Sequence, residues 1–164
     1  MVGDARGGEV PMSHHQRARK LFKQGQHQKS VDLFSLHIAS NPHDDQAHLD
    51  MAAPLFALGE MERAEQAAKS ATELNASNPE AWSTLATIQS ARGQIGTPLK
   101  SILQATRIEP QNIKYRLRLA SLLLDQGHLD HAIKTYDIVL KQDRSNIEAI
   151  AGKASVLERQ GHMR

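Results

Sequence analysis

Apolar residues recur at helical spacing on both sides of Gly127, in the stretch LASLLLDQGHLDHAIKTYDIVLKQD from Leu119 to Asp143. Each of the two runs predicts an amphipathic helix, and the glycine between them predicts the turn of a helical hairpin. The pattern returns every 34 residues, with the glycines Gly25, Gly59, Gly93, Gly127 and Gly161. Seven residues before each of them stands an alanine: Ala18, Ala52, Ala86, Ala120 and Ala154. The chain is therefore predicted to be a series of similar hairpins.

The residues around each glycine indicate how such a hairpin packs. Five positions after the first four glycines the residues are small or compact: Ser30, Ala64, Pro98 and Ala132. Small residues on facing sides let two helices approach closely, and a glycine in the left-handed conformation can end the first helix and turn the chain. One hairpin cannot bury its own apolar stripe, so we expect the copies to stack side by side.

Composition favours an all-α chain that does not enter a membrane. Hydrophobic residues make up 40% of the sequence and aromatic residues only 4%, so Leu, Ile and Ala must fill the core. The longest nearly unbroken apolar run, Met51 to Leu58, has eight residues, far fewer than the roughly 18 of a membrane span. The N-terminal MVGDARGGEVPM has no apolar run and no secretory signal, and we expect residues 1–10 to be a mobile leader. These features predict a cytoplasmic protein.

The repeating residues resemble the tetratricopeptide repeat (TPR), a 34-residue helix-turn-helix unit. The third copy matches its pattern with Trp82, Leu85, Ala86, Gly93, Ala105 and Pro110, and the fourth with Leu119, Ala120, Gly127, Ala132 and Tyr136. On this register the TPR domain spans residues 11–164, with repeats at 11–44, 45–78, 79–112 and 113–146 and a half-repeat at 147–164. The resemblance implies an all-α solenoid, a right-handed superhelix of four and a half repeats.

The same resemblance implies a concave groove lined by the first helix of each repeat, in which a peptide would bind. The family's contact positions correspond here to His15, Arg19, Phe22, Lys23, Leu49, Asp50, Ala53, Phe56, Thr84, Thr87, Lys114, Leu117, Arg118, Ser121, Leu124 and Asp125. The alternative for the apolar members is packing between repeats, and for the basic row of His15, Arg19 and Lys23 it is a solvated helix face.

Three features depart from the family pattern. Pro54 lies inside a predicted helix, where we expect a bend. In the third repeat, GQIGTPLK predicts a late second helix with Thr97 as N-cap and Pro98 as the first helical residue. The sequence ends at ERQGHMR, where another second helix would begin, so residues 147–164 either cap the array or come from a longer protein. A second copy of the chain could cover the apolar face left there, giving a homo-oligomer.

No motif in the sequence predicts catalysis or a cofactor. There is no phosphate-binding GxxxxGK[ST] and no GxSxG, so we expect no catalytic residues and no cofactor. Histidines gather at His128 and His131, and at His43 and His48 with Asp44 and Asp45. Zinc needs three or four converging ligands. His128 and His131 have no third ligand nearby except Asp130 or Asp125, and His48 stands where the third repeat has Trp82, which indicates packing, so we expect no metal site. Ser13 and Gln16 predict a capping box, which places His14 and His15 on a solvated first turn.

Nucleic acid is not the expected partner, although the sequence pI is about 9.0. The formal net charge is only +2. Residues 45–78 contain six acidic and two basic residues, which interrupts any basic stripe that could follow a phosphate backbone. Aromatic residues are also too few to form a stacking platform for bases.

Protein recognition is therefore the predicted function. Lys114 and Arg118 match the last pair of the carboxylate clamp of chaperone-binding TPR proteins, but Leu49, Ala53 and Thr84 replace the other clamp residues, so that ligand is not expected. The alternative is that the chain is the N-terminal recognition or oligomerisation region of a larger enzyme, such as a transferase, whose catalytic domain lies beyond residue 164. The gene sequence after the codon for Arg164 would distinguish the two.

Overall fold

The computed structural model describes residues 11–162, and within that range the chain forms nine α-helices and no strand. The helices are α1 (His14–Lys23), α2 (His27–Ser40), α3 (Asp45–Ala57), α4 (Met61–Leu74), α5 (Pro79–Ala91), α6 (Thr97–Ile108), α7 (Ile113–Asp125), α8 (Leu129–Gln142) and α9 (Ile147–His162). The leader predicted for residues 1–10 lies outside the described residues.

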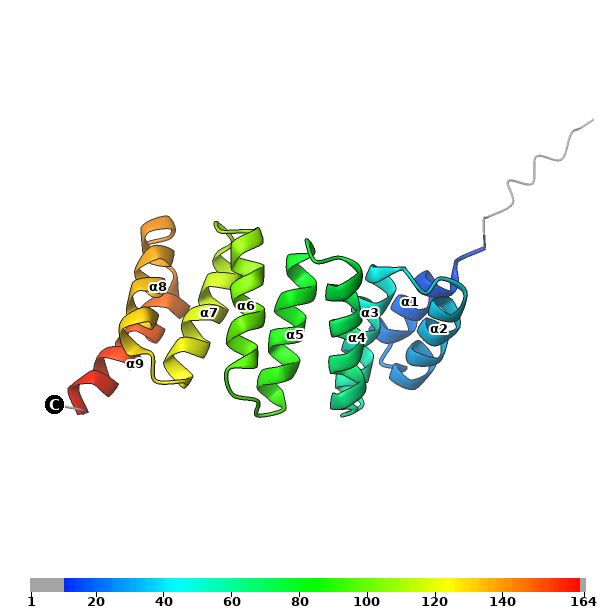
Figure 1. Ribbon diagram of the computed structural model, residues 1–164, viewed down its shortest axis with the longest axis horizontal. Helices are drawn as coiled ribbons and strands as arrows, with labels where there is room; N and C mark the ends of the chain where they lie inside the picture. Colours follow the sequence, from blue (N-terminus) through cyan, green and yellow to red (C-terminus); the bar gives the residue numbers. More distant parts are fainter. Residues whose placement is uncertain (1–10, 163–164) are drawn as a thin grey trace, which may run out of the picture.

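The helices form an elongated array in which sequence neighbours lie side by side (Figure 1). Each helix packs against the next along the chain, and the first helices of successive hairpins also meet: α1 with α3, α3 with α5, and α7 with α9. The prediction of an all-α helical solenoid is confirmed. This arrangement places the first helices next to one another, so their side chains share one surface.

Helix starts repeat with the same period as the glycines. Ser13 caps α1 with the predicted capping box, in which Gln16 bonds back to the backbone of Ser13. Four later first helices begin after a side chain that accepts a hydrogen bond from a backbone N–H in the first turn: Asp44, Asn78, Asn112 and Asn146. These caps satisfy N–H groups that have no partner within the helix. Because the four caps stand 34 residues apart, they are a further signal of the repeat.

Glycine reverses the chain at four of the five predicted positions. Gly25, Gly59, Gly93 and Gly127 have φ angles of +71° to +77°, the left-handed region that glycine adopts without strain. Each donates its N–H to the carbonyl three residues earlier. The prediction was wrong for Gly161, which lies inside α9. No helix follows α9 within the described residues, so no second helix could pack against α9 after a turn at Gly161. The helix therefore continues through this glycine.

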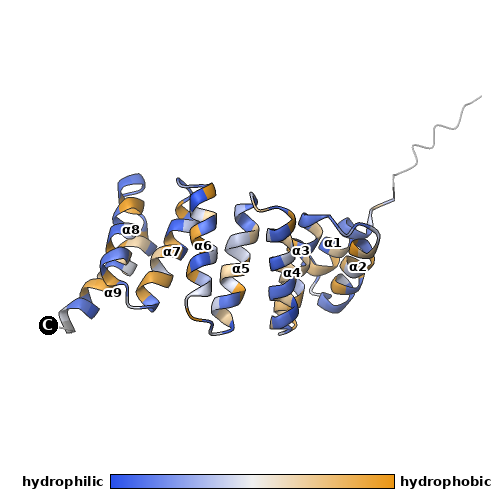
Figure 2. Ribbon diagram, in the orientation of Figure 1, coloured by the Kyte–Doolittle hydropathy of each residue, from blue (hydrophilic) through white to orange (hydrophobic). Residues whose placement is uncertain are grey.

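Small residues bring the paired helices together. Ala18, Ala52, Ala86 and Ala120 are completely buried, as are Ser30, Ala64 and Ala132 from the second helices. Ser30 also donates a 2.8 Å hydrogen bond from Oγ to the carbonyl of Ala18. Figure 2 shows hydrophobic and hydrophilic residues interleaved along the helices, the amphipathic pattern that the sequence predicts. Ala154, the fifth alanine of the series, is exposed on α9.

Two local expectations concern Thr97 and Pro54. The N-cap of α6 is Gly96, with φ +83°, and Thr97 is the first helical residue, so the assignment of Thr97 as the cap was wrong by one position. Gly96 is a second left-handed glycine after Gly93, and it turns the chain one residue before Thr97, so that the helix already begins at Thr97. Pro54 is buried within a continuous α3, and the predicted bend remains a prediction.

None of the described helices combines the length and apolar character that crossing a bilayer requires.

Candidate functional site

Three adjoining hollows run along the first helices. The middle hollow, of about 400 Å³, is lined by residues of α1, α3, α5 and α7, including Phe22, Phe56, Thr84, Ile88 and Lys114. This volume lies within the usual range for ligand-binding pockets. Its lining is largely apolar, with Glu80 and Lys114 as the charged residues.

The two outer hollows continue the middle one in both directions. A hollow of about 270 Å³ on the α1 side shares Phe22, Ala53 and Thr84 with it. A hollow of about 410 Å³ on the α7 side shares Lys114 with it and reaches Glu148 of α9. Because neighbouring hollows share lining residues, they form one continuous depression, called the groove below.

The structure brings most of the predicted site residues together in the groove. Those that line it are Arg19, Phe22, Lys23, Leu49, Asp50, Ala53, Phe56, Thr84, Thr87, Lys114, Leu117, Arg118 and Ser121. Leu49 and Leu117 are also nearly buried, with 4% and 8% of their surfaces exposed, so they contribute to the core as well. Phe56 is 36% exposed, which leaves an aromatic ring available to a ligand.

Three predicted residues do not line the groove. Leu124 is only 9% exposed and belongs to the core cluster of α7, α8 and α9. Asp125 is an exposed residue at the end of α7. His15 is partly buried rather than solvated, because its ring packs edge-on against Phe34 at a centroid distance of 5.6 Å. Of the predicted basic row, Arg19 and Lys23 therefore line the groove, whereas His15 is partly buried and does not.

Some groove residues were missed. Glu80 lines both the middle hollow and the α1-side hollow, and Glu148 lines the α7-side hollow. Both stand 34 residues from Lys114, at the second position of their repeats, so the periodic register could have identified them. Ile88 and Tyr115 lie outside the family's contact positions, and no sequence signal distinguished them from ordinary core residues.

Positive charge is placed at both ends of the groove. Arg19 and Lys23 line the α1 side, where Nε of Arg19 lies 3.4 Å from Oδ2 of Asp50. Lys114 and Arg118 line the α7 side. The Nε of Arg118 is buried and has no hydrogen-bond partner within residues 11–162. A ligand cannot reach a buried Nε, so at this end of the groove the exposed Lys114 offers accessible N–H donors to a group that accepts a hydrogen bond.

The histidine groups considered as metal ligands are arranged differently from the sequence order. His48 points its Nε2 at the carbonyl of Pro42, 3.1 Å away, a packing role that Trp82 repeats 34 residues later with Ala76. The rings of His128 and His131 are 6.5 Å apart. Asp44 instead meets His15 and His37, neither of which was grouped with it on the basis of the sequence.

Comparison with known proteins finds a family match over part of the chain and the same fold in solved structures. Residues 21–88 match the family model described as tetratricopeptide repeat. A search of curated proteins finds no match. Among solved structures, MamA has a TM-score of 0.83 at 15% identity, covering 90% of this chain and 81% of its own.

Two further solved structures have the same fold. YrrB, described as a TPR protein with an unusual peptide-binding site, has a TM-score of 0.79 at 14% identity, covering 90% of this chain and 76% of its own. The first TPR of Spaghetti (RPAP3), solved bound to the HSP90 peptide SRMEEVD, has a TM-score of 0.66 at 21% identity, covering 70% of this chain and 90% of its own. With its 34-residue hairpins and left-handed glycine turns, the chain has the fold of tetratricopeptide repeat proteins, and residues 21–88 match the model of that family.

Proposed function

We propose that the groove binds an extended or helical segment of another protein and that the chain acts as a scaffold rather than a catalyst. The observation that supports this most directly is the continuity of the three hollows along the first helices. A continuous depression suits an elongated polypeptide better than a small metabolite.

The apolar middle of the groove supplies the anchoring contacts. Phe56 and the half-buried Phe22 line it above the buried Ile88. Exposed aromatic rings beside a buried aliphatic floor form the kind of pocket in which an apolar side chain of a partner contributes most of its binding energy. We propose that the ligand segment carries such a side chain near its centre.

The charged residues of the groove determine which ligand residues can flank that anchoring side chain. The exposed Lys114 lines both the middle and the α7-side hollow, and Arg118 lines the α7-side hollow. An acidic side chain or a terminal carboxylate of the ligand would pair with these cations through charge-assisted hydrogen bonds. The peptide-binding descriptions of YrrB and Spaghetti support this use of the fold, while the ligand of this chain is inferred from its own residues.

A library of displayed 15-residue peptides, screened against the full chain, tests the proposal. We expect enrichment of an aromatic or aliphatic residue followed by Asp or Glu. Phe56→Ala and Arg118→Glu should each weaken binding of the enriched peptide about tenfold or more, as for hot-spot residues. Lys141→Glu, an exposed change on α8, is the matched control and should retain binding. Equal affinity in wild type and both groove variants would exclude the groove as the binding site.

Self-association through residues 147–164 remains a prediction. On α9 the apolar side chains of Ile147, Ile150 and Leu157 are 82%, 50% and 52% exposed. We propose that a second copy covers this face, which would remove apolar surface from water. Light scattering should show a dimer mass for the wild-type chain and a monomer mass for the double variant Ile150→Glu/Leu157→Glu. A monomer mass in both would contradict the prediction.

A further inference from the structure

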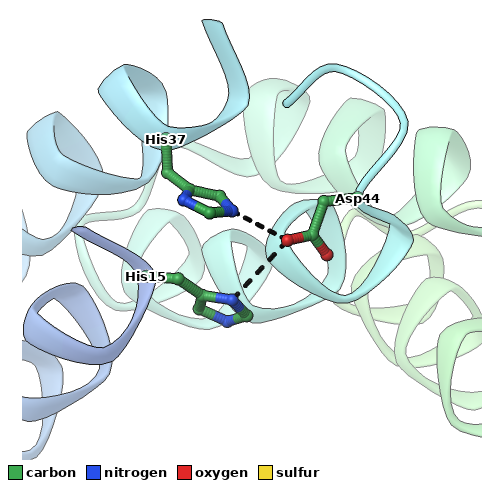
Figure 3. A group of neighbouring side chains, drawn as sticks. All are labelled: His15, His37 and Asp44. Atoms are coloured by element: carbon green, nitrogen blue, oxygen red, sulfur yellow. Dashed lines mark hydrogen bonds and ion pairs between the residues drawn. The ribbon is translucent and has the colours of Figure 1, made fainter. Parts of the chain in front are cut away.

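Three side chains from separate segments converge between the first two hairpins. His15 comes from α1, His37 from α2, and Asp44 from the loop that leads into α3 (Figure 3). One ligand atom of each lies within 4.8 Å of those of the other two. Their side chains are only 17%, 15% and 29% exposed, so the cluster is largely shielded from solvent.

The hydrogen bonds around His15 define which of its nitrogens is free. Nε2 of His15 lies 2.7 Å from Oδ2 of Asp50, and because an ionised carboxylate only accepts hydrogen bonds, Nε2 must carry a proton. In the neutral ring, Nδ1 then presents a lone pair, and it lies 3.7 Å from Oδ2 of Asp44. A lone pair facing a carboxylate oxygen is repulsive, so either a proton on Nδ1 or a metal cation must lie between the two atoms. His37 directs Nε2 at the same oxygen from 2.8 Å.

We propose that His15 Nδ1, His37 Nε2 and the Asp44 carboxylate bind one divalent transition-metal ion, with Zn²⁺ the best match. Two imidazole nitrogens and one carboxylate oxygen are a donor set that zinc uses in sites with three protein ligands, with water in the fourth position. The metal would join α1, α2 and the start of α3, and so would fix the first hairpin to the second.

The surroundings hold the ligands in place as the outer shell of a metal site does. Asp50 accepts a hydrogen bond from the Nε2–H of His15, which orients the ring and makes Nδ1 a better donor to a metal. Asp50 is itself held by Gln46 at 2.8 Å and Arg19 at 3.4 Å. Asp44 Oδ1 accepts the backbone N–H of Ala47 at 3.0 Å, which fixes the carboxylate. These contacts hold two of the three ligands, His15 and Asp44, in the way that outer-shell groups orient the ligands of a metal site.

Movements of at most about 1.4 Å bring ligand atoms that lie within 4.8 Å of one another to the spacing of a zinc site. Zinc bonds of about 2.0–2.2 Å place tetrahedral ligand atoms roughly 3.4 Å apart. The His15–Asp44 separation of 3.7 Å is already close to this, and the His37–Asp44 separation of 2.8 Å must widen by about half an ångström as the metal replaces the shared proton. Side-chain rotations provide movements of this size without shifting a helix.

Calorimetric titration of the full, chelator-treated chain with ZnCl₂ tests the site. We expect one ion per chain and at least tenfold weaker binding in His37→Gln and in Asp44→Asn. Glutamine keeps an N–H donor for Asp44, and asparagine keeps the cap of α3, so both variants should fold. Asp50→Asn leaves all three ligands intact and should still weaken binding about 10–100-fold through His15. Circular dichroism of each variant without metal checks that it folds.

A neighbouring histidine provides the control. His14 is exposed and adjacent to His15 in sequence but is not part of the cluster, so His14→Ala should bind zinc like the wild type. Absence of stoichiometric zinc binding, or equal affinity in the wild type, His37→Gln and Asp44→Asn, would overturn the proposal and leave the cluster as a proton-bridged contact. If one variant is unfolded without metal, the other ligand variant and Asp50→Asn decide the result.

Discussion

Gly152 of α9 lies against the aromatic ring of Tyr136 of α8, so close that a Cβ atom at position 152 would overlap the ring. Tyr136 is 3% exposed and belongs to the core cluster of the last three helices. A glycine inside a helix is unfavourable relative to alanine by about 1 kcal/mol, so local propensity does not explain this residue. The close approach of α9 to α8 explains it.

Gly152→Ala should therefore destabilise the chain by about 1–3 kcal/mol, the usual range for overpacking a core. Replacing the ring in the double variant Gly152→Ala/Tyr136→Leu should recover part of this loss relative to Tyr136→Leu alone, because the alanine then has room. Urea unfolding of the four chains gives the coupling energy. Additive effects of the two substitutions would show that the ring does not impose the glycine.

The turn glycines and Gly161 should respond to alanine in opposite directions. At Gly127, with φ +77°, an added Cβ atom would have no neighbour within 4 Å, so Gly127→Ala should lose about 1–2 kcal/mol from backbone strain alone. Gly161 lies in α9 and is equally open, so Gly161→Ala should raise stability by up to about 1 kcal/mol. Unfolding midpoints measure both, and a loss of stability in Gly161→Ala would contradict its helical conformation.

Leu124→Asp should unfold the C-terminal repeats rather than act only on ligand binding. Leu124 is buried, so the aspartate adds an unpaired polar group to a loss of at least the roughly 3 kcal/mol of a core Leu→Ala change. Arg118→Glu on the same helix, at a half-buried groove position, should change the unfolding free energy by about 1 kcal/mol or less. Urea unfolding separates the two, and similar stability in both variants would place Leu124 outside the core.

The pH dependence of stability should contain a contribution from Asp44. Burial raises the pKa of this carboxyl, but hydrogen bonds from His37 and the Ala47 N–H, with the charge of His15, outweigh it and hold the pKa below the ordinary 3.8. As pH falls, the unfolded chain takes up the proton first, so the contribution is complete above about pH 4 and is lost as pH falls through the folded-state pKa.

Asp44→Asn keeps the helix cap but lacks this titration. We expect the wild type to exceed the variant in unfolding free energy at pH 6 by more than it does at pH 2.5. Urea unfolding at the two pH values, in the presence of a chelator, gives the comparison. A constant difference at both pH values would show that the native carboxyl does not have a lowered pKa.

The placement of site residues was only partly predictable. Arg19, Phe22, Lys114 and Arg118 could be assigned to one surface because the 34-residue register puts equivalent positions on equivalent faces. The register could not tell that Leu124 would be covered by α8 and α9, because burial depends on which helices lie beyond it.

The period, the hairpins and their turns follow from the amino-acid order alone, because left-handed glycines, small facing residues and helix caps act within one 34-residue unit. The remaining features depend on how the hairpins stack. His15, His37 and Asp44 meet only when two hairpins stack, and Gly161 remains helical although it stands in the same register as Gly127. The physical reason is that conformation within a hairpin follows local sterics and hydrogen bonding, whereas burial and side-chain convergence depend on contacts between hairpins.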